Sequence, residues 1–154
     1  MRFNRNLTFL VQQQKQNKRG VILEGSSRSG KTFAGLDFIW YIDEKYPGSE
    51  VIIVRETYNS FKTTLYSDIN RRWPDWGEPS PFEGISERGI FWMPNRTKVS
   101  LMGADNPAKF HGAGSDFFFI NEALDVPQSI FDQLEQRNLN QVMRSGRRIS
   151  NDDN

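Results

Sequence analysis

The feature that most constrains the fold of this chain is the stretch Gly25-Ser26-Ser27-Arg28-Ser29-Gly30-Lys31-Thr32. It fits the phosphate-binding loop pattern G-x-x-x-x-G-K-[ST], which connects a buried strand to the N-terminus of a helix. The apolar run Val21-Ile22-Leu23 precedes the loop and predicts that strand, and residues 33–46 predict the helix. A chance match in a Gly/Ser loop is the alternative. The setting favours an α/β fold that binds a nucleoside triphosphate.

Each part of the loop suits a phosphate. Glycines adopt backbone conformations closed to other residues and let the chain approach an anion closely. The N-terminus of the following helix offers unpaired N–H groups and the positive end of the helix dipole. Lys31 is expected to reach the β- and γ-phosphates, and the Thr32 hydroxyl is expected to hold Mg²⁺. We therefore expect ATP and Mg²⁺ to bind along residues 25–32.

Two polar features near this motif extend the prediction. Arg28 would contact the γ-phosphate and stabilise charge on the transferred group, unless it is a solvent-facing loop arginine. The run Gln12-Gln13-Gln14 precedes the loop. A glutamine amide can pair with the donor and acceptor edge of adenine, so one of the three would select ATP. A polar face of an N-terminal helix is the alternative.

Composition narrows the class of protein. The chain has 154 residues, enough for one domain with its own core. Its net charge of +1 gives no global argument for nucleic acid, so such a surface would be a local patch. The absence of cysteine excludes disulfides and thiolate metal sites. With no apolar stretch of membrane-spanning length and no signal-peptide core, we expect a soluble, cytosolic chain.

Continuous apolar runs predict a mainly parallel sheet covered by helices on both faces. The runs at 21–23, 51–54 and 117–120 lack the alternation of half-exposed strands. Besides the helix at 33–46, helices are expected at 58–73, where Phe61, Leu65 and Ile69 share one face, and at 128–138. The turn cluster Pro94-Asn95-Arg96 predicts a β-hairpin between 89–93 and 97–102.

The remaining segments are predicted to be connections. Residues 77–86 and 103–115 are predicted to be loops because Gly, Pro, Ser and other polar residues dominate them. A further strand is expected to begin at Arg147, and it stops with the chain. We therefore expect a single ATPase domain over residues 1–154 that is partial, with its sheet incomplete at the C-terminus.

The strand at 117–120 supplies the second half of the expected site. In hydrolysing proteins of the phosphate-loop class, a buried strand ends in two acidic residues, of which one supports Mg²⁺ and the other activates water. Here the pair is Asn121-Glu122. Glu122 is the predicted catalytic base because a carboxylate accepts a proton and an amide does not. Asn121 would support the metal through its carbonyl oxygen without adding charge. The alternative is that the pair merely begins a loop.

Several stretches together resemble one family, the large terminase subunit, the ATPase that drives genome packaging in tailed bacteriophages. The stretch from Val51 to Phe61 (VIIVRETYNSF) resembles the second strand of that family and its arginine-containing exit. The stretch from Gly103 to Gly112 (GADNPAKFHG), leading into residues 116–123, resembles the segment before the family's catalytic strand. The loop bearing Arg28 also resembles the terminase form. The resemblance covers residues 20–138.

The resemblance implies a RecA-like (ASCE) phosphate-loop fold and a function in packaging. ATP hydrolysis would be coupled to translocation of double-stranded DNA into the capsid, in a homo-oligomeric ring on the portal protein. A small terminase subunit would deliver the DNA. The setting would be the host cytoplasm at the procapsid portal, with no membrane partner. Large terminases also carry an RNase-H-like nuclease domain, and nothing in these 154 residues resembles it.

The resemblance also draws attention to individual basic residues. His111 stands where relatives often carry an arginine proposed to act on the neighbouring subunit, and Lys109 lies two residues earlier. Arg55 and Arg137 occupy arginine positions typical of the family, although structural ion pairing is an equal interpretation. DNA phosphates would be held by local basic residues without base readout; the candidates are Lys62, Arg71, Arg72 and Arg96, with solvated surface charge as the alternative.

Two other functions remain open from the sequence. One is another phosphate-loop ATPase core, of the helicase or recombinase type. The other is a nucleotide-binding or kinase module that does not hydrolyse ATP, although no basic lid or acceptor-binding segment is evident after the strand at 117–120. Asp116 opens that strand and is expected to have a structural role.

Overall fold

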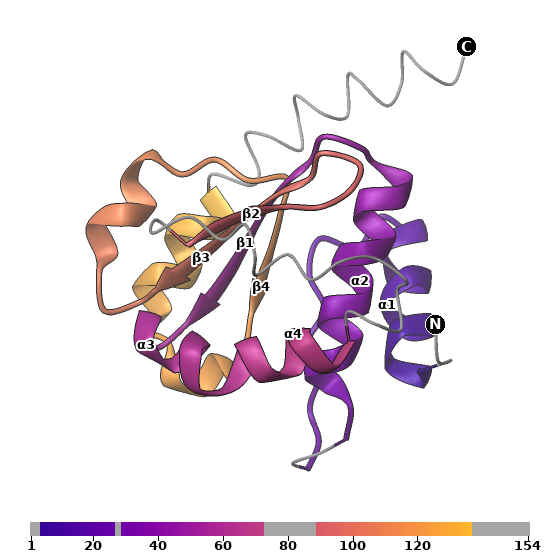
Figure 1. Cartoon of the computed structure of the whole chain (residues 1–154), viewed down its shortest axis with the longest axis horizontal. Coiled ribbons are helices and arrows are strands. Elements are labelled where there is room, and N and C mark those ends of the chain that lie inside the picture. The colour runs from indigo at the N-terminus through magenta and orange to yellow at the C-terminus, as the bar shows by residue number, and fades with distance from the viewer. Residues whose placement is uncertain (1–3, 27–28, 73–88, 137–154) are drawn as a thin grey trace.

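The fold is built around one four-stranded sheet. The computed structural model describes residues 4–26, 29–72 and 89–136 (Figure 1). The strands are β1 (Glu50–Arg55), β2 (Ile90–Trp92), β3 (Lys98–Gly103) and β4 (Phe117–Ile120), arranged in the order β2-β3-β1-β4. β1 runs parallel to both β3 and β4, whereas β2 pairs antiparallel with β3. The mainly parallel α/β class is therefore confirmed.

Helices occupy most of the remaining described chain. They are α1 (Arg5–Lys15), α2 (Lys31–Lys45), α3 (Tyr58–Ser60) and α4 (Tyr66–Arg72), with a π-helical turn at Phe61–Leu65 between the last two. Short 3₁₀ helices follow at Pro107–Gly112 and Ala123–Asp125. Residues 128–136 form one more helix. None of these helices combines the length and apolar character needed to cross a membrane.

The alternation of side chains along β1 creates two cores. Val51 and Ile53 belong to a cluster that includes residues of α2, the π-helical turn and α4. Ile52 and Val54 belong to a second cluster. The other buried members of that cluster are Ala104, Phe110, Ile130 and Leu134. Helices thus cover both faces of the sheet, as predicted (Figure 1).

The helix predicted at 58–73 forms, but it is not uniform. Thr57 caps its start, because its hydroxyl accepts a hydrogen bond of 3.3 Å from the Ser60 amide. Phe61, Leu65 and Ile69 are buried, as the spacing predicts. The π-helical turn at 61–65 is an irregularity that spacing alone does not indicate. Such turns are rare and concentrate at functional sites.

The predicted strand at residues 21–23 is wrong. These residues form no strand, and the Ile22 side chain is 83% exposed. A strand is stable only when a neighbour completes its hydrogen-bond ladder, and within the described ranges β4 pairs with β1 alone. The apolar run therefore has no partner here, and its composition could not reveal that.

Most other elements agree with the sequence. α2 matches the helix expected at 33–46, and the hairpin expected around Pro94-Asn95-Arg96 is β2–β3. The segment predicted to be a loop at 103–115 contains one short 3₁₀ helix. The last expected helix is confirmed over 128–136. The loop at 77–86, positions 137–138 and the tail lie outside the described residues.

Candidate nucleotide-binding site

The phosphate-loop motif has the backbone that its glycines predict. Gly25 has a φ of 149° and Gly30 a φ of 79°, values that residues with a side chain rarely adopt. α2 begins at Lys31, directly after Gly30. The helix N-terminus therefore lies within the motif, where its N–H groups can meet an anion.

Lys31 bonds to the loop that contains it. Its Nζ donates to the Gly25 carbonyl at 2.7 Å, the Ser26 carbonyl at 2.8 Å and the Ser29 hydroxyl at 2.8 Å. An ammonium has three donors, so these bonds use its full capacity. A phosphate that binds Lys31 must replace at least one of them. Ser27 and Arg28 lie outside the described residues, so Arg28 stays a prediction.

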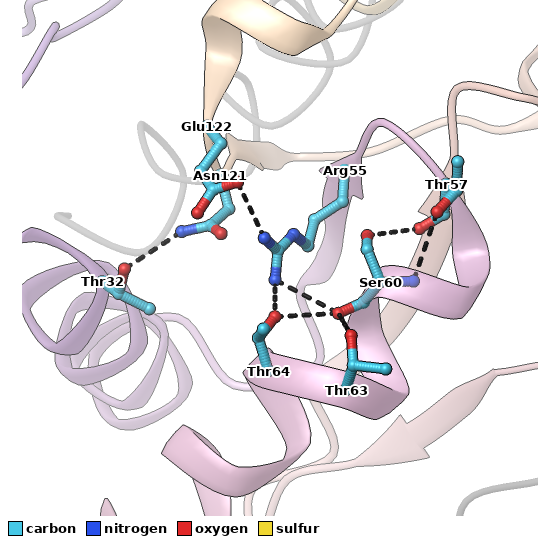
Figure 2. Close-up of polar contacts among 8 residues, drawn as sticks. All are labelled: Thr32, Arg55, Thr57, Ser60, Thr63, Thr64, Asn121 and Glu122. Atoms are coloured by element: carbon cyan, nitrogen blue, oxygen red, sulfur yellow. Dashed lines mark hydrogen bonds and ion pairs between the residues drawn. The ribbon is translucent and has the colours of Figure 1, made fainter.

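The predicted metal pair, Thr32 and Asn121, is brought together. The Asn121 side chain is buried and donates through Nδ2 to the Thr32 Oγ1 at 3.2 Å (Figure 2). This contact is prepared by close packing of α2 on β4: a Cβ at Gly35 would lie 2.5 Å from the Phe119 ring. Thr32 and Gly35 are three apart on a helix, and Phe119 and Asn121 two apart after a strand, so each pair shares a face.

The same pair of side chains offers oxygen atoms that fit Mg²⁺. Accepting one bond leaves the Thr32 hydroxyl a second lone pair, and the carbonyl oxygen of Asn121 also accepts. Mg²⁺ usually takes one or two protein oxygens and completes its shell with phosphates and water. Among the described residues no group of three or more His, Cys, Asp or Glu gathers into a metal cluster. The oxygens of Thr32 and Asn121 are of the kind that Mg²⁺ accepts beside a nucleotide.

Glu122 follows β4 in a conformation that costs energy. Its φ and ψ are 59° and 60°, the left-handed region, which disfavours a residue with a Cβ by roughly 1 kcal/mol. Non-glycine residues in this region cluster at functional sites. The side chain is 62% exposed, and one carboxylate oxygen forms an ion pair of 2.9 Å with Nη2 of Arg55.

Arg55 is the buried partner of this ion pair. Its side chain is 7% exposed, at the end of β1. The second terminal nitrogen, Nη1, donates to the Ser60 carbonyl at 3.2 Å and to the Thr64 hydroxyl. Figure 2 shows the guanidinium between Glu122 on one side and Ser60 and Thr64 on the other. Arg55 thus forms an ion pair, and its partner is the predicted catalytic base; the contacts with Ser60 and Thr64 were not predicted.

Asp116 and Gln14 both form side-chain contacts that bear on their predicted roles. Asp116 accepts a 2.9 Å bond from the Glu50 amide through its side chain, which ties the starts of β4 and β1 together. Its expected structural role is confirmed. Gln14 donates to the Tyr46 hydroxyl at 2.7 Å, past the C-terminal end of α2. A helix of that length spans about 20 Å, so Gln14 lies far from the loop and serves the helix–helix contact.

Among the described residues, the basic side chains named from the sequence, either as DNA contacts or at the family's arginine positions, do not form one cluster. Lys62 and Lys109 have their ammonium groups 5.9 and 5.4 Å from the Tyr58 ring, beyond the C-terminal end of β1. Arg96 lies in the turn before β3, at the opposite edge of the sheet. Arg71 and His111 are exposed. The Arg72 side chain and Arg137 lie outside the described residues.

Two tyrosines, Tyr58 and Tyr66, are joined by a hydrogen bond between their side chains. Burial and a hydrogen bond with Tyr58 raise the pKa of Tyr66 to about 12. Both effects disfavour the phenolate, because it loses water and the bonding partner. In the folded state, Tyr66 therefore keeps its proton well above neutral pH.

Solved structures resemble this fold. The large terminase from a thermophilic bacteriophage matches with a TM-score of 0.69 and 14% identity over 90% of this chain and 36% of that chain. The same terminase in complex with ADP matches with a TM-score of 0.69 and 14% identity, over 88% of this chain and 35% of that chain. The large terminase ATPase domain of Thermus phage P74-26 matches with a TM-score of 0.55 and 19% identity, over 74% and 52%.

These matches establish a RecA-like fold, and the chain spans about a third of the length of the first terminase. No curated protein matches the sequence. A family model does: the N-terminal part of the terminase large subunit of T4-like-virus type matches residues 22–142, most of the chain. On the strength of that match, the chain belongs to the terminase large subunit family.

Proposed function

We propose that this chain is the ATP-binding and ATP-hydrolysing module of a viral DNA-packaging terminase. The observation that carries the proposal is the 3.2 Å bond from Asn121 to Thr32, because it joins the phosphate-loop helix to the end of β4. Glu122 is the next residue, which supports a site shared by the loop and a carboxylate. A large terminase of similar fold has been solved in complex with ADP, which supports a nucleotide at the loop.

The residues divide the work of phosphoryl transfer. Lys31 and the amides of the loop bind the β- and γ-phosphates, and Arg28 assists at the γ-phosphate. Thr32 and Asn121 hold Mg²⁺, which neutralises developing charge on the phosphates when bound. Glu122 orients a water molecule and takes its proton. Arg55 pairs with one oxygen of the Glu122 carboxylate and so orients it, while the second oxygen can accept from water.

The proposed partners, which are DNA, the portal protein and a small terminase subunit, are inferred from the terminase family. Hydrolysis would drive double-stranded DNA into the capsid, with the module working in a homo-oligomeric ring on the portal protein and supplied with DNA by a small terminase subunit. The place of action would be the host cytoplasm, at the procapsid portal. Residues 1–154 would belong to a single ATPase domain. DNA would be held through phosphates by basic side chains such as Lys62.

Titration with ATP tests the nucleotide site, with and without Mg²⁺. We expect the wild-type chain to bind ATP and Lys31→Ala to lose most of the affinity, because the ammonium compensates phosphate charge. Glu122→Gln should keep affinity and lose turnover. Absence of ATP affinity in the presence of Mg²⁺ would contradict the proposal, and normal turnover in Glu122→Gln would remove Glu122 as the base.

A second measurement separates packaging from the helicase alternative. The turnover of a terminase module should respond to double-stranded DNA more than to single strands of equal length. The response should decline steeply with salt, since phosphate contacts release counterions. A preference for single strands would favour a helicase core.

A further inference from the structure

α1 is fastened to α2 at both of its ends. At the far end, Gln14 bonds to Tyr46, and its Oε1 accepts from the Tyr41 hydroxyl and the Lys45 ammonium, each at 3.3 Å. At the near end, Asn4 and Asn6 bond to the phosphate loop. Figure 1 shows α1 along the outer side of α2. The position of the loop is therefore tied to the N-terminal helix.

The two asparagines bind successive carbonyl groups. The Asn6 Nδ2 donates to the Ser29 carbonyl at 3.0 Å, and the Asn4 Nδ2 donates to the Gly30 carbonyl at 3.1 Å. These are the last two carbonyls before α2 begins. The Gly30 carbonyl also accepts the 2.9 Å bond from Ala34 that opens the helix. Both peptide groups are thus held in a fixed orientation.

The orientation of a carbonyl fixes the N–H of the same peptide group. No peptide bond in the described residues is cis, so each C=O and the following N–H point in opposite directions. Ser29 and Gly30 direct their carbonyls toward the asparagines. The N–H groups of Gly30 and Lys31 consequently point away from α1. Backbone N–H groups at this part of a phosphate loop are the ones that cradle phosphate.

Asn4 is suited to this position in a second way. Its Oδ1 accepts a 2.9 Å bond from the Asn6 amide and so caps α1, while the Nδ2 of the same side chain reaches Gly30. A Cβ on Gly30 would lie 3.2 Å from that Nδ2. The absence of a side chain at Gly30 therefore provides the room that Asn4 occupies.

We propose that Asn4 and Asn6 are positioning residues of the phosphate site. They aim the Gly30 and Lys31 amides at the phosphates of the nucleotide, without touching it. This inference rests on the proposed function, in that the loop must bind ATP. It assigns part of the nucleotide affinity to a helix that lies outside the motif.

Serine substitutions separate this role from capping. Asn4→Ser keeps an oxygen that caps α1 and loses the donor to Gly30, and Asn6→Ser loses the donor to Ser29. We expect each to weaken ATP binding by about fivefold, the value of one ordinary hydrogen bond. Tripolyphosphate, which has no base, should lose affinity by the same factor. Asn95→Ser is the matched control, because Asn95 is exposed in the turn between β2 and β3.

Amide exchange supplies a readout that needs no nucleotide. The amides of Gly30 and Lys31 should exchange faster in both variants, whereas those of residues 9–15 should not in Asn4→Ser. The inference would be overturned if the variant with both substitutions, Asn4→Ser and Asn6→Ser, bound ATP as tightly as the wild type. It would also be overturned if only ATP and not tripolyphosphate lost affinity, or if amide exchange at Gly30 and Lys31 did not change. Failure of the wild-type chain to bind ATP would contradict the proposed function instead, and the exchange rates would still decide about the asparagines.

Discussion

Arg55 and Glu122 form an ion pair of 2.9 Å in which one partner is buried and the other exposed. The Arg55 guanidinium has further bonds to Ser60 and Thr64 through its other terminal nitrogen. The Glu122 carboxylate is mostly exposed. Rotation of the Glu122 side chain would therefore break fewer contacts than departure of Arg55.

A double-mutant cycle measures how strongly the pair is coupled. We expect Arg55→Met and Glu122→Gln each to lower the free energy of unfolding, and the double variant to cost less than their sum. The coupling should be about 1 kcal/mol, because the exposed carboxylate is partly screened by water. Urea unfolding of the four proteins provides the numbers. Strict additivity would mean that the ion pair contributes nothing to stability.

Gly35→Ala should destabilise the chain although alanine favours helices. The new methyl group would lie 2.5 Å from the Phe119 ring, and overpacking of this kind costs about 1–3 kcal/mol. That cost exceeds the helix-propensity gain of about 1 kcal/mol. The unfolding temperature and the ATP affinity should both decrease, because the clash with Phe119 would move Thr32 away from Asn121.

Two controls accompany the Gly35 variant. Gly112→Ala should be nearly neutral, since nothing lies within 4 Å of a Cβ at that position. Adding Phe119→Leu to Gly35→Ala should recover part of the loss by making room. If the double variant were less stable than both single variants, close packing between α2 and β4 would not be the cause.

Tyr66 should make the fold sensitive to alkali. Its pKa is raised to about 12 in the folded chain, from 10.0 for an unperturbed tyrosine. The folded state therefore binds more protons than the unfolded state between these values. The contribution of Tyr66 to stability is complete below pH 10 and is lost as the pH rises toward 12. Urea unfolding at pH 8 to 11.5 should show this decline, and it should be smaller in Tyr66→Phe.

Asn121→Asp should strengthen the dependence of ATP binding on Mg²⁺. The carboxylate adds a charge that the amide lacks, while the Thr32 hydroxyl can donate to it and preserve the contact. The Mg²⁺ concentration for half-maximal ATP binding should decrease severalfold. Asn121→Ser should raise it. An identical Mg²⁺ requirement in all three proteins would place the metal elsewhere.

Local signals predicted the parts of the molecule that local physics determines. The motif at 25–32 located the loop because glycine conformations and a helix N-terminus are properties of adjacent residues. The pair Asn121-Glu122 was located by the apolar strand before it. The strand at 21–23 failed because pairing depends on a neighbour that the run itself does not specify.

Contacts between segments far apart in the chain could not be predicted from the sequence pattern. Nothing in the spacing of Asn4 and Asn6 indicates that they bond to carbonyls more than twenty residues away. The hydrogen bond from Arg55 reaches Thr64, a residue of the π-helical turn, which apolar spacing of four does not distinguish from a regular helix. The run Gln12-Gln13-Gln14 offered amides that could pair with adenine or form a polar helix face, and the contacts of Gln14 with Tyr46 favour the helix face for that residue.

The left-handed backbone at position 122 has a consequence for how this protein would respond to selection. In an Arg55→Met background, which lacks the ion pair, a library randomised at that codon and sorted for folding alone should enrich glycine, asparagine and aspartate over glutamate, since they tolerate φ of 59° better. Sorting for ATP turnover should restore glutamate. The difference between the two outcomes would measure how much stability the chain gives up to keep a long carboxylate at the end of β4.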